Sequence, residues 1–370
     1  MNSAQVVSLL NKDNNVTRKT QGIFRGWLRG IEGYSDVIGH LTLVRKIGHN
    51  SRKVSQIDGQ MAGLKLDVLG LKRAEHIIAV SACTKADLVK RLGISEEKIT
   101  VVYNGVDRRL FRPVPGKDLG FQFVLYVGTE RPRKNLSVLL EALAILKKGG
   151  GTLSGLKLVK AGNSGRSDSF RQSTISEMRR LGLDDEVVFV EHVPDEELPG
   201  YYCSALALVM PSLYEGFGLP IVEAMACGCP VICSNNSSLP EVAGEASLFF
   251  APDDSNRLAC LIQQLASEPS LRDELVRKGF RQVQRFSWER AAYETLKVYC
   301  KVEERLGLRC ETAKVSLPQT LALPNVSETR LTQRLSPEKR VPPVSAMRYY
   351  RASRNHYSKS ANNCSQSFRN

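Results

Sequence analysis

Several features of secreted and membrane proteins are missing from this chain of 370 residues. It has no apolar run of about 18 residues, the length that spans a bilayer, and its start lacks the apolar core of a signal peptide. Its nine cysteines show no second ligand pair at the usual zinc spacing. We therefore predict a cytoplasmic protein with reduced thiols, in which Cys227, Cys229 and Cys233 are buried free thiols rather than metal ligands.

Two chemical motifs are also absent. No Gly-x-Gly-x-x-Gly follows an early predicted strand, which argues against a dinucleotide-binding dehydrogenase. No Asp-x-Asp triplet is present to indicate a divalent-metal clamp, and we expect Asp253-Asp254 to form a solvated turn. The sequence thus predicts no metal site and no bound cofactor.

The most informative segment runs from Glu215 to Glu223 and reads Glu-Gly-Phe-Gly-Leu-Pro-Ile-Val-Glu. The short apolar run Ala205 to Met210 predicts a buried strand before it, and Pro220 suits the first position of a helix that continues to Cys227. Glu215 is therefore expected at the carboxyl end of a strand.

This segment has the features of a nucleotide-sugar site. Gly216 and Gly218 let the backbone approach a ligand, and the N–H groups at the start of the helix favour a diphosphate. Glu223, expected in the first turn of the helix, could accept hydrogen bonds from a ribose diol. The alternative is an ordinary strand-turn-helix whose glutamates cap the helix or lie in solvent.

A basic loop follows an upstream strand. Phe123 to Val127 is predicted as a strand that ends at Gly128, and Leu136 to Leu146 as an apolar-periodic helix. Between them lie three cations, Arg131, Arg133 and Lys134. These side chains could neutralise a diphosphate, or they could belong to a solvated loop.

The same order of strand and helix recurs along the chain. Leu156 to Val159 precedes Ala161-Gly-Asn, and Val187 to Val190 precedes Glu-His-Val-Pro. Strands that alternate with helices at this spacing predict an α/β fold with a parallel sheet covered on both faces. Ligands then bind at the carboxyl ends of the strands.

Together these motifs resemble a known family. Tyr126-Val-Gly-Thr with Pro-Arg-Lys-Asn-Leu, and the run from Pro211-Ser-Leu-Tyr-Glu-Gly-Phe-Gly through Cys-Gly-Cys-Pro-Val-Ile, are similar to retaining glycosyltransferases of family 4. The resemblance covers roughly residues 74 to 300, including Ile77-Ile-Ala-Val-Ser, Val102-Tyr-Asn-Gly-Val-Asp and Pro240-Glu-Val-Ala-Gly. It implies a GT-B fold of two Rossmann-like domains with parallel sheets, the C-terminal one holding a nucleoside-diphosphate (NDP) sugar, and metal-independent transfer with retention at the anomeric carbon.

The resemblance also implies domain limits. Residues 1–115 would form a shortened acceptor-side domain, 116–285 the donor-binding domain, 286–308 a helix that crosses back with Ser287 as its N-cap, and 309–370 a basic disordered tail. From Lys301 onward the chain holds 13 Lys and Arg against five acids. The arginine and tyrosine pairs of this tail could touch nucleic acid or a membrane, but we expect a solvated tail and no nucleic-acid partner.

The resemblance also implies roles for individual residues, at the positions where this sequence matches the family's motifs. Lys134 would contact the donor phosphates, Gly218 and Leu219 would offer backbone N–H groups, Glu223 would bind the ribose and Glu215 would face the sugar. Thr129 stands where the family usually has arginine, and Arg131 and Arg133 are the two candidates to compensate for it. The predicted catalytic residues are Glu215, Lys134 and Arg133, and the predicted donor-binding residues are Gly128, Thr129, Arg133, Lys134, Gly162, Val193, Glu215, Gly216, Phe217, Gly218, Leu219, Pro220 and Glu223.

The chemistry of transfer gives these residue types a role. Cleavage of a sugar-phosphate bond builds negative charge on the diphosphate and positive charge on the anomeric carbon, so fixed cations and helix N–H groups lower the barrier. Glu215 could act as a nucleophile, an electrostatic stabiliser or a positioning group. Front-face displacement through the donor's own phosphate is a further route.

The N-terminal half departs from the family pattern. Ala4 to Leu10 could be a first strand and Thr17 to Ile31 a first helix, yet about 60 to 90 residues of further βα units are missing before Ile77. The basic, amphipathic first helix could pack on the core or lie on the inner membrane surface. His40 is the nearest candidate for an acceptor-side histidine, with His49 and Asp58 as alternatives.

The sequence therefore predicts a glycosyltransferase that moves a hexose from an NDP-sugar to a glycan or lipid-linked acceptor with retention. Relatives with Pro-Arg-Lys-Asn use mannose donors, so GDP-mannose is the first candidate and UDP-sugars remain open. The alternative is a catalytically impaired nucleotide-sugar-binding protein with an incomplete acceptor domain, because transfer needs two halves that close around both substrates.

Overall fold

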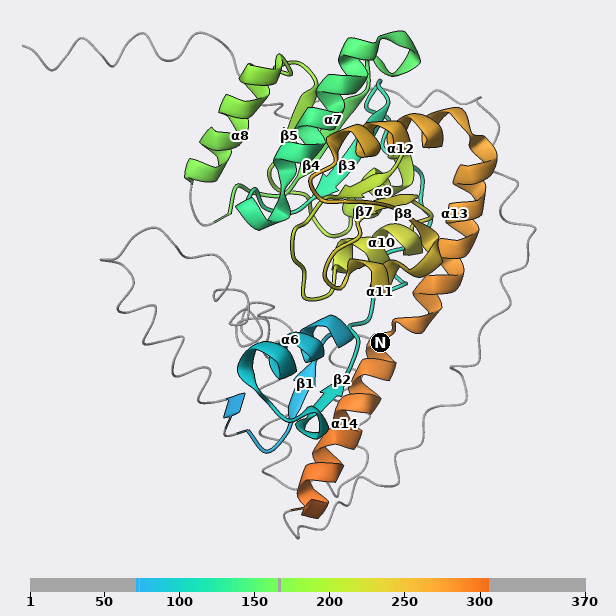
Figure 1. Cartoon of the computed structure of the whole chain (residues 1–370). Coiled ribbons are helices and arrows are strands. Elements are labelled where there is room, and N and C mark those ends of the chain that lie inside the picture. The colour runs from blue at the N-terminus through green and yellow to red at the C-terminus, as the bar shows by residue number, and fades with distance from the viewer. Residues whose placement is uncertain (1–70, 73, 166–167, 306–370) are drawn as a thin grey trace, which may run out of the picture.

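The computed structural model describes residues 71–72, 74–165 and 168–305 (Figure 1). The expected strand Ala4 to Leu10, the helix Thr17 to Ile31, the candidates His40, His49 and Asp58, and the tail from residue 309 lie outside the described residues. The limits proposed for the domains remain predictions.

A six-stranded parallel sheet forms the larger unit. Its order is β5-β4-β3-β6-β7-β8, and every strand pair is parallel. The strands are β3 (Phe123–Val127), β4 (Lys157–Ala161), β5 (Val187–Val190), β6 (Leu208–Met210), β7 (Val231–Ser234) and β8 (Ser247–Phe250). The intervening helices are α7 (Leu136–Gly149), α8 (Asp168–Leu181), α9 (Leu198–Ser204), α10 (Leu219–Ala226), α11 (Leu239–Ala243), α12 (Ser255–Ser267) and α13 (Pro269–Gln282).

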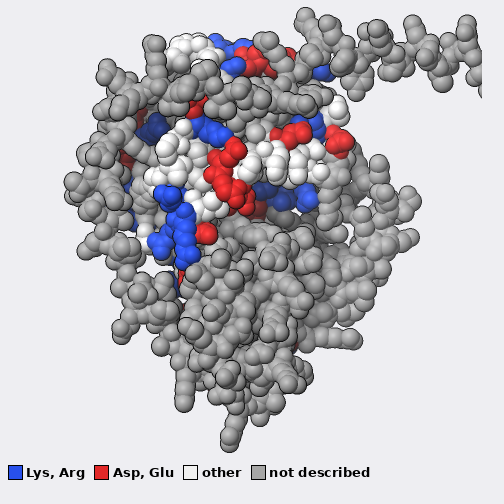
Figure 2. All heavy atoms as spheres, turned by 180° about the vertical axis from the view of Figure 1, so that it is seen from behind, with Lys and Arg blue, Asp and Glu red and all other residues white. Residues whose placement is uncertain are grey.

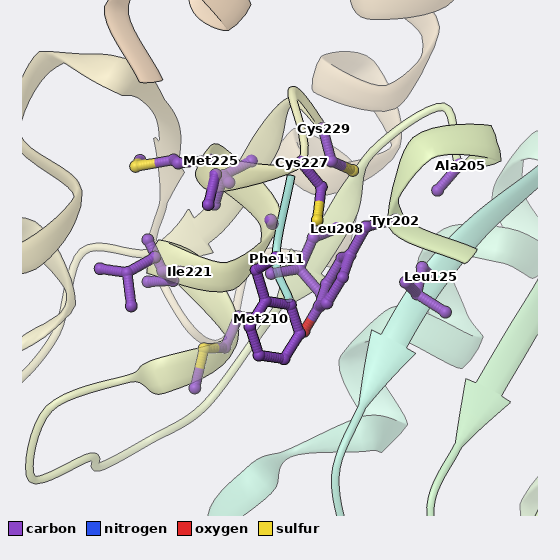
Figure 3. Close-up of a cluster of buried hydrophobic side chains, with 14 of the residues drawn as sticks. Phe111, Leu125, Tyr202, Ala205, Leu208, Met210, Ile221, Met225, Cys227 and Cys229 are labelled. Carbon is purple, nitrogen blue, oxygen red and sulfur yellow. The ribbon is translucent and has the colours of Figure 1, made fainter. Parts of the chain in front are cut away.

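Both faces of this sheet are buried. Alternate residues of β3 enter different apolar clusters: Phe123 and Leu125 pack with α9 and α10, whereas Val124 and Tyr126 pack with α7 and α12. Figure 3 shows part of the first cluster, where Met210 lies toward Ile221 of α10 and Leu125 lies on the other side, near Ala205. This double burial is the reason why β3 is continuously apolar rather than alternating.

A smaller unit precedes the sheet. Strand β1 (Ile77–Ala79) pairs in parallel with β2 (Ile99–Val101), and α6 (Ala82–Leu92) connects them. The apolar core of this unit includes Leu88. The last described helix, α14 (Trp288–Arg305), extends along this unit (Figure 1), and Lys301 and Arg305 lie close enough to lower the pKa of His76 after the larger effect of burial.

Most predicted elements of the larger unit are confirmed, with shifted ends. β3 and β5 have the predicted limits, but α7 continues to Gly149 and β4 runs from Lys157 to Ala161 rather than from Leu156 to Val159. The strand predicted from Ala205 begins at Leu208, because Ala205 caps α9. Apolar residues at a buried helix end cannot be told from strand residues by periodicity alone.

Three further predictions concern the N-cap of the last helix, the turn at Asp253-Asp254 and the state of the cysteines. Ser287 caps α14, since its Oγ accepts the Arg290 N–H at 3.1 Å. Asp253-Asp254 lies in an exposed turn, as predicted, and Asp254 also caps α12 by accepting the Arg257 N–H at 2.8 Å. The cysteines that the structure describes are free thiols, with Cys227, Cys229 and Cys233 buried, except for Cys300, which is disulfide-bonded.

None of the helices in the described ranges is apolar and long enough to span a bilayer. On the face shown in Figure 2, acidic and basic side chains of the described residues are intermixed.

Candidate functional site

The direction of the chain reverses between β3 and β6. From β3 the chain moves outward through β4 and β5, and it then returns to place β6 on the other side of β3 and continues to β7 and β8. In open α/β sheets, ligands bind beyond the carboxyl ends of the strands at such a switch point. The loops that follow β3 and β6 carry the predicted catalytic residues.

Arg133, Lys134 and Glu215 meet at this point. Lys134 Nζ lies 2.7 Å from Glu215 Oε1, and Arg133 Nη1 lies 3.1 Å from the same oxygen. Arg133 also donates to the Tyr214 carbonyl at 3.2 Å, and its own carbonyl accepts the Leu213 N–H at 2.8 Å. The Glu215 side chain is only 7% exposed. The basic segment is therefore packed against the β6 loop, and the alternative of a solvated loop does not hold for Arg133 and Lys134.

Glycines bring the backbones of neighbouring loops together. Gly128 has a φ of 146°, and a Cβ added there would lie 3.7 Å from Lys134 Nζ. Gly162, at a φ of 113°, is so close to Gly128 that an added Cβ would lie 3.0 Å from its carbonyl oxygen. The loops after β3 and β4 are thus in contact, Gly162 has too little room for a side chain, and both residues have a positive φ that favours glycine.

The start of α10 faces the same edge of the sheet. Gly218 occupies the N-cap with a φ of 105°, followed by Leu219 and Pro220, so the helix begins one residue earlier than predicted. A Cβ on Gly218 would meet Leu239 Cδ2 at 2.9 Å. The Ser238 hydroxyl lies 3.0 Å from both the Glu215 and Phe217 carbonyl oxygens, which fixes the loop before the helix.

The N-terminal unit also touches this loop. The Thr84 hydroxyl donates to the Gly216 carbonyl at 3.4 Å, and the Tyr214 hydroxyl donates to Asp87. At the start of α6, the Glu241 carboxylate accepts the backbone N–H groups of Ala82 and Cys83 at 2.6 and 3.1 Å. Elements from both units thus surround the segment that contains Glu215.

Glu223 differs from its prediction in one respect. It is the fifth residue of α10 and lies in the second turn, not the first. Its Oε2 accepts a hydrogen bond from the Tyr202 hydroxyl at 2.7 Å. Burial raises the pKa of Glu223 to about 7, the Tyr202 hydrogen bond opposes this shift, and nearby Asp195 adds to it. A carboxylate with one hydroxyl donor retains capacity to accept others.

The other predicted residues have distinct places. The Thr129 carbonyl accepts the Tyr126 hydroxyl at 2.8 Å, and the Arg131 side chain lies beside Gly165. Of the two arginines offered as substitutes at position 129, Arg133 is the one that contacts Glu215. Val193 packs against the apolar cluster around α10. The Phe217 ring is buried against Phe286, with ring centroids 5.5 Å apart, so only its backbone is available to a ligand.

Sequence reasoning missed the residues that support this site. Tyr202 fixes Glu223 and packs edge-on against Phe111 with a centroid separation of 6.2 Å (Figure 3). Glu130 and Lys160 form an ion pair whose side chains are both 0% exposed. An isolated Tyr, Glu or Lys gives no local signal of such pairing. In the case of Glu130 and Lys160, their positions at the ends of adjacent parallel strands were the available clue.

The fold and the site together define a class. The described residues form a parallel α/β unit whose charged loops meet at the switch point of the sheet, where such folds bind nucleotides. This unit is linked to a second, smaller α/β unit, and two such units are the organisation of the GT-B fold. The model of the glycosyl transferases group 1 family matches residues 107–282, and that of glycosyltransferase family 4 matches residues 51–110. The chain belongs to the group 1 glycosyltransferases.

Relatives and solved structures agree with this assignment. The chain is 33% identical over 238 residues to O-antigen chain mannosyltransferase B of Escherichia coli, covering 62% of this chain and 61% of that protein. It is 32% identical to the MMP alpha-(1->4)-mannosyltransferase of Mycolicibacterium hassiacum, covering 64% and 56%. The match to that second relative thus spans little more than half of its length.

Two solved structures show the same fold. Sucrose-phosphate synthase from Thermosynechococcus elongatus superposes with a TM-score of 0.61 and 28% identity, covering 75% of this chain and 72% of the other. HepE from Anabaena, solved in complex with UDP, gives a TM-score of 0.57 and 22% identity, with coverages of 67% and 70%.

Proposed function

We propose that this protein transfers a hexose, with mannose as the first candidate, from an NDP-sugar to a glycan or lipid-linked acceptor. The observation that carries the proposal is the convergence of Lys134 and Arg133 with Glu215 at the switch point, beside the N-terminus of α10. The names of the related mannosyltransferases support the choice of donor sugar, and GDP-mannose is the first donor to test.

The two cations suit the leaving group of such a reaction. A diphosphate placed near the start of α10 would meet the helix N–H groups and lie within reach of Lys134 and Arg133. Negative charge that develops on the diphosphate during bond cleavage is stabilised by donors already fixed in place. No metal ion takes part in this proposal.

The pairing of Glu215 favours two of its three candidate roles. Its Oε1 is engaged by both Lys134 and Arg133. Such pairing stabilises the carboxylate and lowers its tendency to form a covalent bond, so we assign Glu215 to positioning of the cations and to electrostatic stabilisation of the sugar. Retention then proceeds by front-face displacement through the donor's own phosphate.

Glu223 completes the donor site in this proposal. Its carboxylate accepts hydrogen bonds from the ribose hydroxyls while Tyr202 holds its other side. Burial raises the pKa of Glu223, whereas hydroxyls that donate to its carboxylate stabilise the charged form, so donor binding is expected to lower this pKa.

The test is turnover of GDP-mannose by the full chain, with UDP-glucose and ADP-glucose in parallel, in the presence and absence of EDTA. We expect release of GDP, undiminished by EDTA, and an α-linked product from the α-linked donor by NMR. Lys134→Ala and Glu223→Ala should weaken donor binding. Saturable nucleotide binding without turnover across many acceptors would instead support the nucleotide-sugar-binding alternative, and absence of both would refute the proposal.

A further inference from the structure

A buried lysine lies beneath the two glycine loops of the donor site. Lys160, in β4, has a side chain that is 0% exposed, and its Nζ lies 2.9 Å from Glu130 Oε1. Glu130 follows Gly128 and Thr129 in the loop after β3. Burial lowers the pKa of Lys160, and the Glu130 carboxylate opposes that shift. Apolar residues of similar volume often replace a buried ion pair at no loss of stability, so this pair calls for another role.

Lys160 holds the loop after its own strand. Besides Glu130, its Nζ donates to the carbonyl of Gly162 and, at 2.8 Å, to that of Asn163. These three acceptors match the three donors of an ammonium group. In a planar trans peptide the C=O and the following N–H point in opposite directions. The N–H groups of Asn163 and Ser164 therefore point away from the buried ammonium.

A second cation completes the network. Arg171 of α8 donates from Nε to Glu130 Oε1 at 2.7 Å and from Nη1 to Glu191 Oε1 at 2.9 Å. Its guanidinium also stacks on Phe189 of β5, 4.2 Å from the ring centroid. Glu130 is thus held from two directions, and the loop after β3 is tied to β4, to α8 and to the end of β5.

The network is linked to the predicted catalytic residues through the backbones of Gly162 and Gly128. Lys160 fixes Gly162, and Gly162 is in close contact with Gly128. Gly128 in turn lies against Lys134, which pairs with Glu215. A shift of the loop after β4 would therefore displace the loop that presents Lys134.

We propose that Lys160 is a positioning residue that holds the loops after β3 and β4 in the arrangement that receives the diphosphate of the donor. It does so by drawing inward the Gly162 and Asn163 carbonyls of the loop after β4 and the Glu130 carboxylate of the loop after β3, so that backbone N–H groups and Lys134 face the ligand. Successive N–H groups in this orientation form a concave anion site. This inference rests on the proposed function, since it presupposes a diphosphate ligand.

The experiment compares Lys160→Met with Lys157→Met in the full chain. Lys157 is the first residue of the same strand, and its Nζ donates to the Asp185 carbonyl at 2.8 Å, away from both glycine loops. Calorimetry would use whichever of GDP, UDP and ADP binds the unmodified chain most tightly. We expect about tenfold weaker binding to Lys160→Met, the equivalent of one charge-assisted hydrogen bond, and unchanged binding to Lys157→Met.

Hydrogen exchange separates positioning from a general loss of stability. In Lys160→Met, amides of residues 128–131 and 162–165 should exchange faster, while those of β7 keep their wild-type protection. Because the loss of the Lys160 ammonium removes one of the two cations beside the buried Glu130 and could impair folding, the double variant Lys160→Met, Glu130→Met serves as a second test. It removes both charges, and the same loss of nucleotide affinity is expected.

Wild-type affinity and loop exchange in either folded variant would overturn the inference. So would failure of both variants to fold, because the network would then serve the stability of the domain rather than the placement of its loops. If none of the three nucleotides binds the unmodified chain, the proposed function itself fails, which is a separate outcome.

Discussion

Replacing Glu223 by Gln tests the environment of the residue assigned to the ribose. The Glu223 side chain is partly buried and accepts the Tyr202 hydroxyl, and its pKa is raised from an ordinary value of 4.5 to about 7, chiefly by burial. Glutamine has nearly the same shape and still accepts the Tyr202 hydrogen bond, but it does not ionise. The substitution therefore removes the titration and leaves the packing in place.

The magnitude follows from linkage between protonation and folding. A carboxyl group whose pKa is higher in the folded than in the unfolded state favours folding when protonated, below about pH 4.5. That contribution is lost as the pH rises to about 7 and beyond. At about 1.4 kcal/mol per pH unit between the two pKa values, the whole effect is about 3 kcal/mol, of which about 2 to 3 kcal/mol falls between pH 5 and 8.

The assay is urea unfolding of the wild type and Glu223→Gln at pH 5, 6, 7 and 8. The wild-type free energy of unfolding should fall by about 2 to 3 kcal/mol more than that of the variant over this range. Glu245→Gln, at an exposed residue in the turn after α11, should run parallel to the wild type. Parallel curves for wild type and Glu223→Gln would refute the reasoning.

Two further predictions concern packing and the contact between the units. A Cβ on Gly105 would lie 2.1 Å from the Trp288 backbone nitrogen, so Gly105→Ala should lower the unfolding free energy by about 1 to 3 kcal/mol, whereas Gly149→Ala, with open space around it, should not. Glu241→Ala removes the carboxylate that accepts two N–H groups at the start of α6, and it should cost about 1 kcal/mol and speed amide exchange in α6, whereas Glu245→Ala should change neither.

Much of the larger unit could be predicted from the sequence because its signals are local. Double-sided burial makes β3 a short, continuous apolar run, and the apolar run of the edge strand β5 is equally local; the predicted limits of both agree with the structure. The ends of α7 and β6 were less predictable, since a helix that stops on Gly150 and an apolar helix end at Ala205 depend on packing against neighbours. The existence of a strand can thus be predicted from its own residues, whereas its last residue depends on contacts with distant parts of the chain.

The candidate site shows the same division. Glu215, Gly218 and Lys134 stand in motifs whose spacing predicts a strand end and a helix start, and the structure brings them to one edge of the sheet. The partners Tyr202 and Lys160 lie in ordinary stretches of sequence. Their roles depend on tertiary packing, because α9 places the Tyr202 hydroxyl beside Glu223 of α10, and β4 places the Lys160 ammonium beside the Gly162 carbonyl.

The most direct test of the central claim is calorimetric titration of the full chain with GDP, UDP and ADP, repeated for Lys134→Ala and for the control Lys157→Ala. We predict saturable binding of at least one nucleotide and a loss of about ten- to a hundredfold in affinity for Lys134→Ala, with Lys157→Ala unchanged. No binding of any of the three, or equal affinity in all three proteins, would contradict the claim that a diphosphate is held at the switch point of this sheet.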